Sequence, residues 1–379
     1  MNRRHLQPRV PADPAAAALA EPVQRLRRIH RAVSDLRRGV PVLLTGGGDT
    51  LALLAAEAAS PQGMAELASM AEEPPVVLLA PTRGAAVLRR PVEHGADAVA
   101  LHLPESVLEP EVLRRIADPT LAQPRTARPA EPAPVPPLAS AALALVKLAQ
   151  LLPAVLAAPV RGPAEGLLDV AAADIMAYPA SAAAGLHRVA AALVPLQDAP
   201  DARVVAFRSE GSGLEHLAIL VGEPDKADAP LVRLHSECFT GDLLGSLRCD
   251  CGQQLRGAVR RMAEEGSGVL LYLAQEGRGI GLVNKLRAYA LQDRGLDTLD
   301  ANRALGWDAD ERNFLIAARM LEALGIHRVR LLTNNPDKLT ALEACGVEIA
   351  GREPHTFAPN GVNDEYLATK AARFGHMLD

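Results

Sequence analysis

Aromatic side chains are scarce in this chain, because Phe, Trp and Tyr together make up 3% of its 379 residues. A surface that stacks the bases of single-stranded nucleic acid needs such rings, so that class of protein is poorly supported. An excess of positive charge is also lacking, since 40 Lys and Arg face 45 Asp and Glu and the formal net charge is −5. A general nucleic-acid-binding protein carries a basic face or a high pI, and we therefore expect no nucleic-acid partner.

Cysteines and long apolar runs are few as well. Four cysteines in a chain of this length do not make a disulfide framework, and they favour reduced thiols or metal ligands. The sequence has no stretch of about 18 uninterrupted apolar residues that could cross a membrane. The N-terminus also lacks the apolar core of a signal peptide. We therefore expect a cytoplasmic protein with no membrane partner.

What is present is a globular composition, 49% hydrophobic and 22% charged, in a chain long enough for two domains. Residues 1–25 are rich in Pro, Ala and Arg and predict a flexible tail. A Pro-rich stretch at 119–137 has no apolar periodicity and predicts an exposed loop or linker. We place the domain boundary near 199, which gives an N-terminal domain at 26–198 and a C-terminal domain at 199–379.

Strand patterns alternate with helix patterns along both halves, which predicts an α/β layer arrangement. In the N-terminal half, strands are expected at 40–44 and 75–80, and helices at 23–38, 51–59, 64–72 and 141–152. In the C-terminal half, strands are expected at 231–235, 269–273 and 329–333, and helices at 253–265, 281–294, 310–324 and from Pro336 onwards.

Three of the four cysteines cluster as Cys238, Cys249 and Cys251, with the spacing C-x10-C-x-C. Three thiolates can form a tetrahedral zinc site with one position open, and an open position is typical of catalytic zinc. The alternative is three buried, unreactive thiols, since free cysteine packs as a small apolar residue. Clustering among His, Glu, Arg and Asp side chains favours zinc, whereas the isolated Cys345 is interpreted as a core or surface thiol.

Three further segments contain residues that could bind an anion or supply a carboxylate to a site. Residues 275–281 (QEGRGIG) predict a turn where backbone N–H groups approach an anion, although an ordinary tight turn is an equal alternative. Residues 310–312 (DER) are expected to open a helix, where the helix dipole alone favours carboxylates. Residues 333–338 (TNNPDK) follow a strand at the edge where open α/β sheets bind ligands. In isolation, a turn capped by asparagine explains that last segment better.

Together these segments resemble GTP cyclohydrolase II, the enzyme that opens the guanine ring at the start of riboflavin biosynthesis. The resemblance runs from about Arg203 to the C-terminus. It rests on 233–242 (RLHSECFTGD), 246–252 (SLRCDCG), 275–282 (QEGRGIGL), 287–293 (RAYALQD), 310–312 (DER) and 332–336 (LTNNP). It implies a mixed sheet with helices, a homodimer, and hydrolysis of GTP to 2,5-diamino-6-(5-phospho-D-ribosylamino)pyrimidin-4(3H)-one with release of formate and pyrophosphate.

The resemblance also implies the ligands of the site. Cys238, Cys249 and Cys251 would hold one Zn²⁺ per subunit, whose water attacks C8 of the guanine. Mg²⁺ would accompany the GTP triphosphate, because it prefers hard oxygen donors. The implied substrate contacts, all present in this sequence, are Arg233, Leu234, His235, Ser236, Glu237, Gln254, Glu276, Gly277, Arg278, Thr298, Thr333 and Lys338.

Three further residues match catalytic positions of that family. Tyr289 matches a tyrosine placed near the reacting purine, and Asp310 matches the proposed proton acceptor. Arg312 matches the residue assigned as nucleophile towards the α-phosphorus. Because a guanidinium stays protonated in ordinary surroundings, Arg312 is interpreted as at least an electrostatic clamp on the phosphates.

The N-terminal half resembles, more weakly, a 3,4-dihydroxy-2-butanone-4-phosphate synthase, a partner often fused upstream of this enzyme. The segments that resemble its framework are 30–39 and 55–61. Between them that family carries an acidic metal-binding run, whereas here Asp49 is the only acid in 45–54. The later Gly-His-Thr-Glu motif of that family reads Gly-Pro-Ala-Glu at 162–165. Sugar-phosphate rearrangement needs clustered carboxylates and an acid/base pair, so we predict an inactive half that serves packing, dimerisation or regulation.

Two other interpretations stay open. A homologue could have changed to another purine or pyrimidine nucleotide, or stop after partial ring opening, because pocket specificity can shift without loss of motifs. A zinc-stabilised nucleotide-binding regulatory protein would instead bind nucleotide without turnover. The pair Asp310 and Arg312 distinguishes this last class, since a protein that only binds nucleotide has no need of it. We therefore predict an enzyme.

Overall fold

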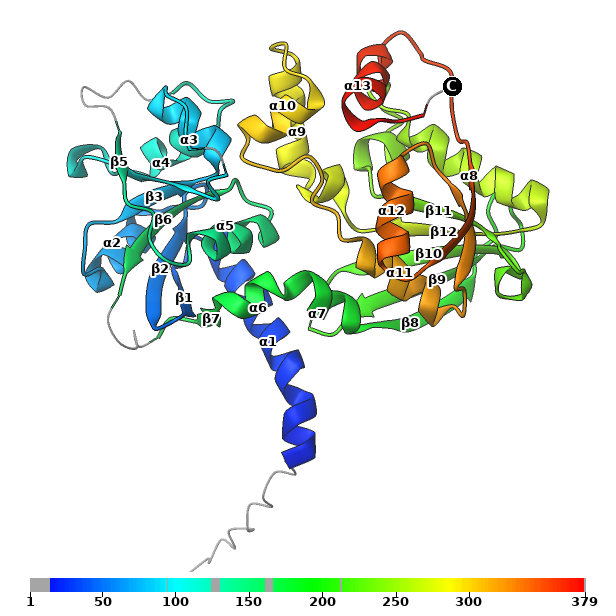
Figure 1. The fold of residues 1–379 in the computed structure, drawn as a ribbon, viewed down its shortest axis with the longest axis horizontal. Helices are drawn as coiled ribbons and strands as arrows, with labels where there is room; N and C mark the ends of the chain where they lie inside the picture. The colour runs from blue at the N-terminus through cyan, green and yellow to red at the C-terminus, as the bar shows by residue number, and fades with distance from the viewer. Residues whose placement is uncertain (1–13, 94, 124–129, 161–165, 212, 378–379) are drawn as a thin grey trace, which may run out of the picture.

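The computed structural model describes residues 14–93, 95–123, 130–160, 166–211 and 213–377. Within these residues the chain forms two seven-stranded sheets, and helices pack against both (Figure 1). The mixed α/β class expected from the sequence is confirmed. No helix in the described part of the chain is both long enough and apolar enough to cross a membrane.

The first sheet has the strand order β5-β4-β3-β6-β2-β1-β7, and only the pair β1 and β7 is parallel. Its strands are β1 Val42–Gly46, β2 Asp49–Ala55, β3 Val76–Leu79, β4 Val99–His102, β5 Glu131–Ala133, β6 Ala154–Pro159 and β7 Asp169–Ala171. The helices of this half are α1 Pro14–Arg37, α2 Pro61–Met70, α3 Pro81–Leu88, η1 Glu105–Val107, α4 Pro110–Ala117, α5 Ala139–Leu148, α6 Ala172–Met176 and α7 Tyr178–Ala184.

The second sheet has the order β14-β13-β11-β12-β10-β9-β8. Strands β11 to β14 pair in parallel, and β8, β9 and β10 extend the sheet by antiparallel pairing. Its strands are β8 Leu186–Leu193, β9 Arg203–Ser209, β10 Glu215–Gly222, β11 Leu231–Ser236, β12 Ser267–Leu273, β13 Arg328–Leu332 and β14 Glu348–Glu353. The helices are η2 Pro224–Lys226, the π-helix η3 Phe239–Leu243, α8 Cys251–Glu265, η4 Glu276–Gly279, α9 Leu282–Gln292, α10 Thr298–Ala304, α11 Phe314–Ala323, α12 Pro336–Ala344 and α13 Asp364–Phe374.

The two halves share an apolar core. Helices α9 and α10 belong to the second half in sequence, yet they lie between the halves (Figure 1). Leu291, Leu305 and Trp307 form one buried cluster with Leu43 and Leu54 of the first sheet. The opposite face of that sheet packs against α1, α5 and α6. Burial of these side chains joins the halves through an interface rather than through a linker alone.

The helix expected at 51–59 is wrong, because residues 49–55 form β2. This strand pairs antiparallel with β1, from Val42↔Leu53 to Gly46↔Asp49. Gly47 and Gly48 have φ values of +63° and +93°, and such left-handed residues suit a two-residue hairpin turn. Residues 51–55 are all buried, so the alternation of a half-exposed strand is missing. A short apolar run then looks the same in a buried helix and in a buried strand.

Other element boundaries also differ from expectation. The first helix begins at Pro14 rather than near 23, because an alanine-rich segment favours helix and proline suits a first turn. Residues 14–25 of the expected tail are therefore helical, and residues 1–13 lie outside the described residues. The expected loop at 119–137 contains the short strand β5, and its residues 124–129 also lie outside.

Strand β8 pairs with β9 along its length, so the second sheet starts before the expected domain boundary at 199. We propose 186 as the start of the C-terminal domain. The helix expected from 310 begins instead at Phe314, because the Asn313 side chain caps it by accepting a hydrogen bond from Leu315 N at 3.1 Å. The segment 310–312 consequently lies in the loop before α11 rather than in its first turn.

Candidate active site

The carboxyl ends of β11, β12 and β13 meet at one edge of the second sheet, because these strands are parallel. Cys238 follows β11, Glu276 follows β12, and Thr333 follows β13. The sequence motifs that carry these residues are far apart in the chain but meet at this edge, where open α/β sheets bind ligands.

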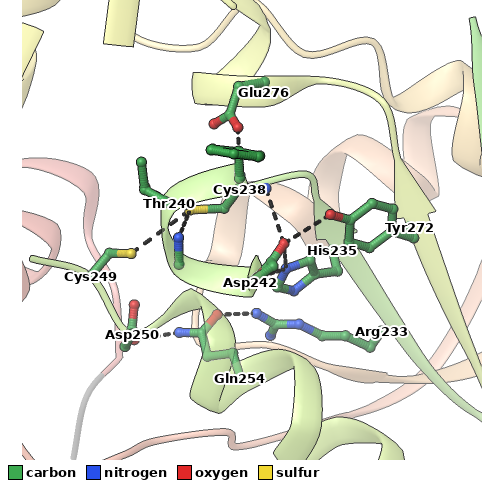
Figure 2. Close-up of polar contacts among 12 residues, drawn as sticks. Arg233, His235, Cys238, Thr240, Asp242, Cys249, Asp250, Gln254, Tyr272 and Glu276 are labelled. Carbon is green, nitrogen blue, oxygen red and sulfur yellow. Dashed lines mark hydrogen bonds and ion pairs between the residues drawn. The ribbon is translucent and has the colours of Figure 1, made fainter. Parts of the chain in front are cut away.

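The sulfur atoms of Cys238, Cys249 and Cys251 all lie within 4.8 Å of one another. Cys238 Sγ is 3.8 Å from Cys249 Sγ (Figure 2). Two thiolates bound to one Zn²⁺ at about 2.3 Å, in tetrahedral geometry, lie about 3.8 Å apart. The spacing of this pair therefore fits zinc without rearrangement.

The charges of the three thiols also favour a cation. Hydrogen bonds from Cys249 and Cys251 lower the pKa of Cys238, and Lys285 Nζ adds to this effect from 3.0 Å. Hydrogen bonding to Cys238 raises the pKa of Cys249, and hydrogen bonding to Cys238 and Cys249 raises the pKa of Cys251 well above its ordinary value. Three neighbouring thiolates therefore need a positive ion between them, which is what a divalent metal provides.

Gly241, in η3, packs directly against this cluster. Its N–H donates to Cys238 Sγ at 3.3 Å. A β-carbon at position 241 would lie 2.8 Å from Cys249 Sγ and 3.0 Å from Cys238 Sγ. Both distances are shorter than an ordinary contact of about 3.5–4.0 Å. Only glycine leaves the sulfur atoms where they are.

Asp242 organises the segment that follows β11 (Figure 2). Its carboxylate lies 3.0 Å from His235 Nε2 and accepts hydrogen bonds from Cys238 N at 3.0 Å and Tyr272 OH at 3.1 Å. Because a carboxylate only accepts, Nε2 of His235 carries the proton in this contact. Asp242 thus fixes both the orientation of His235 and the backbone of the first cysteine.

A second chain of hydrogen bonds links the pocket to the other two cysteines. Arg233 donates to Leu332 O at 2.9 Å and to the side chain of Gln254, which in turn donates to Asp250 (Figure 2). Asp250, which lies between Cys249 and Cys251 in sequence, also accepts from Lys370 Nζ at 2.7 Å. The cysteine loop is therefore held by both the sheet and the C-terminal helix α13.

Buried cations line the pocket beside the cysteines. Arg233 is 5% exposed and Lys338 is 8% exposed. Burial lowers the pKa of Arg233 to about 10. Burial, with Arg312 and Arg233 nearby, also lowers the pKa of Lys338 well below its ordinary value. A bound polyphosphate would relieve this repulsion, because an anion within hydrogen-bonding distance favours the charged forms.

Asp310 and Arg312 form a two-point ion pair at the margin of the pocket. Arg312 Nε donates to Asp310 Oδ1 at 2.8 Å, and its NH2 group donates to Oδ2. Burial raises the pKa of Asp310, but hydrogen bonds from Arg312 outweigh this and hold the pKa below its ordinary value. Asp310 is therefore ionised at neutral pH and orients the guanidinium.

Tyr289 lies on the face of α9 that is turned to the pocket, one helical turn from Lys285. The guanidinium of Arg248 lies 4.5 Å from the centre of its ring, within cation–π range. Burial raises the pKa of Tyr289, so its phenol stays protonated and can donate a hydrogen bond.

One pocket contains nearly all of the site residues expected from the sequence. They are Arg233, Leu234, His235, Ser236, Glu237, Cys238, Cys249, Cys251, Gln254, Glu276, Gly277, Arg278, Tyr289, Thr298, Arg312, Thr333 and Lys338. Asp310 does not line the pocket and reaches it through Arg312.

Several pocket residues were not expected from the sequence, among them Lys285, Lys370 and His376. Lys285 could have been found, because it is four residues before Tyr289 on a helix and so shares its face. Lys370 and His376 could not have been found in the sequence, because only the tertiary fold brings the C-terminal segment over the pocket. Met377 N donates to Asn334 O at 2.9 Å, which anchors that segment. The buried Nε2 of His376 has no hydrogen-bond partner among the described residues.

Comparisons with known proteins point to one family. The sequence profile described as GTP cyclohydrolase II matches residues 187–354. A GTP cyclohydrolase-2 of Azospirillum brasilense is 47% identical over 386 aligned residues, which cover 97% of this chain and 99% of that protein. A GTP cyclohydrolase-2 of Azotobacter vinelandii is 55% identical over 172 residues, covering 45% of this chain and 83% of that protein.

Among solved structures, a two-domain 3,4-dihydroxy-2-butanone 4-phosphate synthase from A. baumannii covers 85% of this chain and 98% of its own. The identity is 17% and the TM-score is 0.33. A likeness at this level supports no conclusion about either half.

Proposed function

This chain belongs to the GTP cyclohydrolase II family and is an enzyme of riboflavin biosynthesis, and from this we propose how its own residues act on GTP. The proposal is that the pocket binds GTP and releases formate and pyrophosphate, leaving 2,5-diamino-6-(5-phospho-D-ribosylamino)pyrimidin-4(3H)-one. One observation carries it. A three-thiol cluster with zinc spacing opens into the same pocket as the buried cations Arg233 and Lys338.

We propose that Cys238, Cys249 and Cys251 hold one Zn²⁺ per subunit. Zinc with three protein ligands keeps one position open and supplies a Lewis acid that lowers the pKa of water there. Mg²⁺ is proposed to enter with the triphosphate, because hard oxygen donors suit it. Gly241 and Asp242 serve this site by fixing the thiols and the backbone of Cys238.

The triphosphate end of GTP is assigned to the cationic side of the pocket. Arg233, Arg278 and Lys338 offer donors to phosphate oxygens, and Thr333 offers its hydroxyl. Arg312, held by Asp310, is assigned as a clamp on the α-phosphate. This role needs only the positive charge and the donors on the other edge of the guanidinium, because Asp310 accepts from Nε and from one NH2 group.

The purine end is assigned to the side near the cysteines. Burial and the nearby carboxylates of Glu276 and Asp242 raise the pKa of Glu237, and Glu237 is assigned to the base because it lines the pocket next to Cys238. Glu276 is also proposed to contact the substrate, and its carboxylate is held by hydrogen bonds from Phe239 N and from Lys285 Nζ. Tyr289 completes this side as a hydrogen-bond donor.

The remaining proposed substrate contacts come from the family resemblance and from their place in the same pocket. They are Leu234, His235, Ser236, Gln254, Gly277 and Thr298. Lys370 and His376 are added to them because they line the pocket from the C-terminal side.

We propose that the N-terminal half does not carry out sugar-phosphate chemistry. Asp49, the only acid of segment 45–54, is exposed at the start of β2, and residues 162–165 lie outside the described residues. The full-length protein should form no butanone phosphate from ribulose 5-phosphate and Mg²⁺. Formation of that product would show that this half has kept an active site.

A homodimer in the cytoplasm is also proposed, as the family resemblance implies. Light scattering coupled to size-exclusion chromatography should give twice the chain mass of 40.0 kDa. A monomer that is fully active would contradict the dimer.

The function itself is tested by incubating zinc-loaded protein with GTP and Mg²⁺. Formate and pyrophosphate should appear in equal amounts, and mass spectrometry should identify the pyrimidine product. The Cys249→Ser variant should lose formate, whereas Cys345→Ser, a matched change outside the cluster, should keep it. Bound nucleotide and zinc with neither product would favour the nucleotide-binding regulatory protein instead.

A further inference from the structure

The N-terminal half contacts the loop that carries the proposed clamp on the phosphates. Lys147, in α5, donates from Nζ to Glu311 Oε1 at 2.6 Å and to Asp308 Oδ2 at 2.7 Å. The side chains of Lys147 and Glu311 are each 20% exposed, so this ion pair is largely shielded from water. Such pairs are screened less by salt than pairs at the open surface.

Glu311 is held from several directions at once. Its Oε1 also accepts from Asp308 N at 2.9 Å, and its own N–H donates to Arg278 O at 3.0 Å. Gly279 packs so closely that a β-carbon there would lie 2.8 Å from Glu311 O. Glu311 therefore contacts Lys147 through its carboxylate, and through its backbone it contacts the turn that presents Arg278 to the pocket.

The surroundings keep Lys147 in place. The carbonyl oxygen of Gln150, in the turn after α5, accepts from Asn284 Nδ2 at 2.9 Å. Arg287, in α9, forms ion pairs of 2.9 Å with both Glu57 and Asp118 of the N-terminal half. Trp307 lies near the start of the loop between α10 and α11, which carries Asp310 and Arg312, and it is 2% exposed in the core that the two halves share.

We propose that Lys147 is a positioning residue for the GTP cyclohydrolase reaction, which holds the loop of Asp310 and Arg312 in place through Glu311. The N-terminal half thereby supports the active site of the C-terminal half without touching substrate. Without Lys147, the Glu311 carboxylate loses its cation, and the loop that carries Arg312 loses its ion pair with the N-terminal half. The inference rests on the proposed function, because it assumes that Arg312 acts on the triphosphate.

This support is a feature of the present two-part chain. The aligned residues of the Azotobacter vinelandii relative make up 83% of that protein but only 45% of this chain. That protein therefore has no room for a comparable N-terminal half. The Azospirillum brasilense relative spans both halves. The contact between Lys147 and Glu311 therefore belongs to the architecture in which the two halves occur together.

The test uses full-length Lys147→Met, Lys147→Arg and Glu311→Gln proteins. As a control, Lys226→Met breaks an exposed ion pair with Glu223. We expect Lys147→Met to lower kcat for pyrophosphate release about tenfold or more, which corresponds to about 1.4 kcal/mol. The KM for GTP should stay within about twofold and zinc content unchanged. Lys147→Arg should recover most of kcat because it keeps the positive charge.

A second readout does not depend on turnover. Trp307 is the only tryptophan of the chain, and Lys147 Nζ lies 5.8 Å from the centre of its ring. Release of the loop should make Trp307 more accessible to acrylamide in both Lys147→Met and Glu311→Gln, but not in Lys226→Met. Glu311→Gln tests the same contact if Lys147→Met fails to fold.

The outcomes separate the two proposals. A wild-type protein that forms no formate or pyrophosphate, but whose Trp307 is released in the variants, refutes the proposed function and keeps the anchoring of the loop. Wild-type kcat and unchanged quenching in Lys147→Met refute the positioning role. A parallel loss of kcat, GTP affinity and zinc that Lys147→Arg does not recover also refutes it, since it indicates general damage.

Discussion

Replacing Gly241 by alanine should weaken the metal site without removing any of its ligands. The added β-carbon would lie 2.8 Å from Cys249 Sγ and 3.0 Å from Cys238 Sγ. Restoring an ordinary contact of about 3.5 Å requires the nearer sulfur to move by about 0.7 Å. Zinc–ligand distances tolerate only about 0.2 Å, so the site cannot absorb this shift. Disturbing the support of a metal ligand typically lowers affinity about 10- to 100-fold, and we expect a loss in that range.

The assay is competition for zinc between the protein and a chromophoric chelator, followed by measurement of formate from GTP. Gly351→Ala is the matched control, because a β-carbon at position 351 would have no atom of the described residues within 4 Å. The control should keep wild-type zinc affinity and formate release. If Gly241→Ala bound zinc as tightly as wild type and released formate at the same rate, the close packing of this glycine against the thiols would be refuted as a determinant of the site.

Two other predictions follow from the same structure. Arg312→Lys should lower the rate of pyrophosphate release about tenfold without abolishing it, because lysine retains the charge but not the two-point fork. Complete loss of pyrophosphate release would contradict the clamp and favour a covalent role. Burial lowers the pKa of His216 to about 4, and its Nδ1 accepts from Ala274 N at 3.1 Å. The unfolded chain, with a histidine pKa of about 6.5, therefore takes up the proton first, and this site costs about 2 kcal/mol of folding stability between pH 7 and pH 5. In His216→Gln, the free energy of unfolding measured with urea should fall less between pH 7 and pH 5 than it does in wild type. An equal fall in both proteins would refute His216 as the cause.

The sequence was most informative where one strand leads directly into one motif. Cys238 and Thr333 follow strands that are parallel and joined in one sheet, so their motifs had to meet at its carboxyl edge. The zinc spacing needed only local sequence, because Cys249 and Cys251 are two residues apart at the start of α8. These parts of the site are predictable from the order of residues alone.

Other parts of the fold and of the site depend on tertiary packing, which no local sequence pattern predicts. Residues 51–55 are buried on both faces, so their apolar run did not distinguish a strand from a helix. Lys147 and Glu311 are 164 residues apart, and their ion pair exists only because α9 and α10 pack onto the first sheet. His376 enters the pocket because α13 folds back over it and Met377 bonds to Asn334. Each of these features is a product of the tertiary fold.

X-ray absorption at the zinc edge would distinguish a zinc ion held by three thiolates, with one open position, from any other coordination of the metal. We expect one zinc per subunit with three sulfur neighbours at about 2.3 Å and one oxygen neighbour at about 2.0 Å. Cys249→Ser should lose one sulfur neighbour or the metal itself. Four sulfur neighbours would indicate a closed structural site, and zinc without sulfur neighbours would place the metal elsewhere; either result would refute an open three-thiolate zinc site.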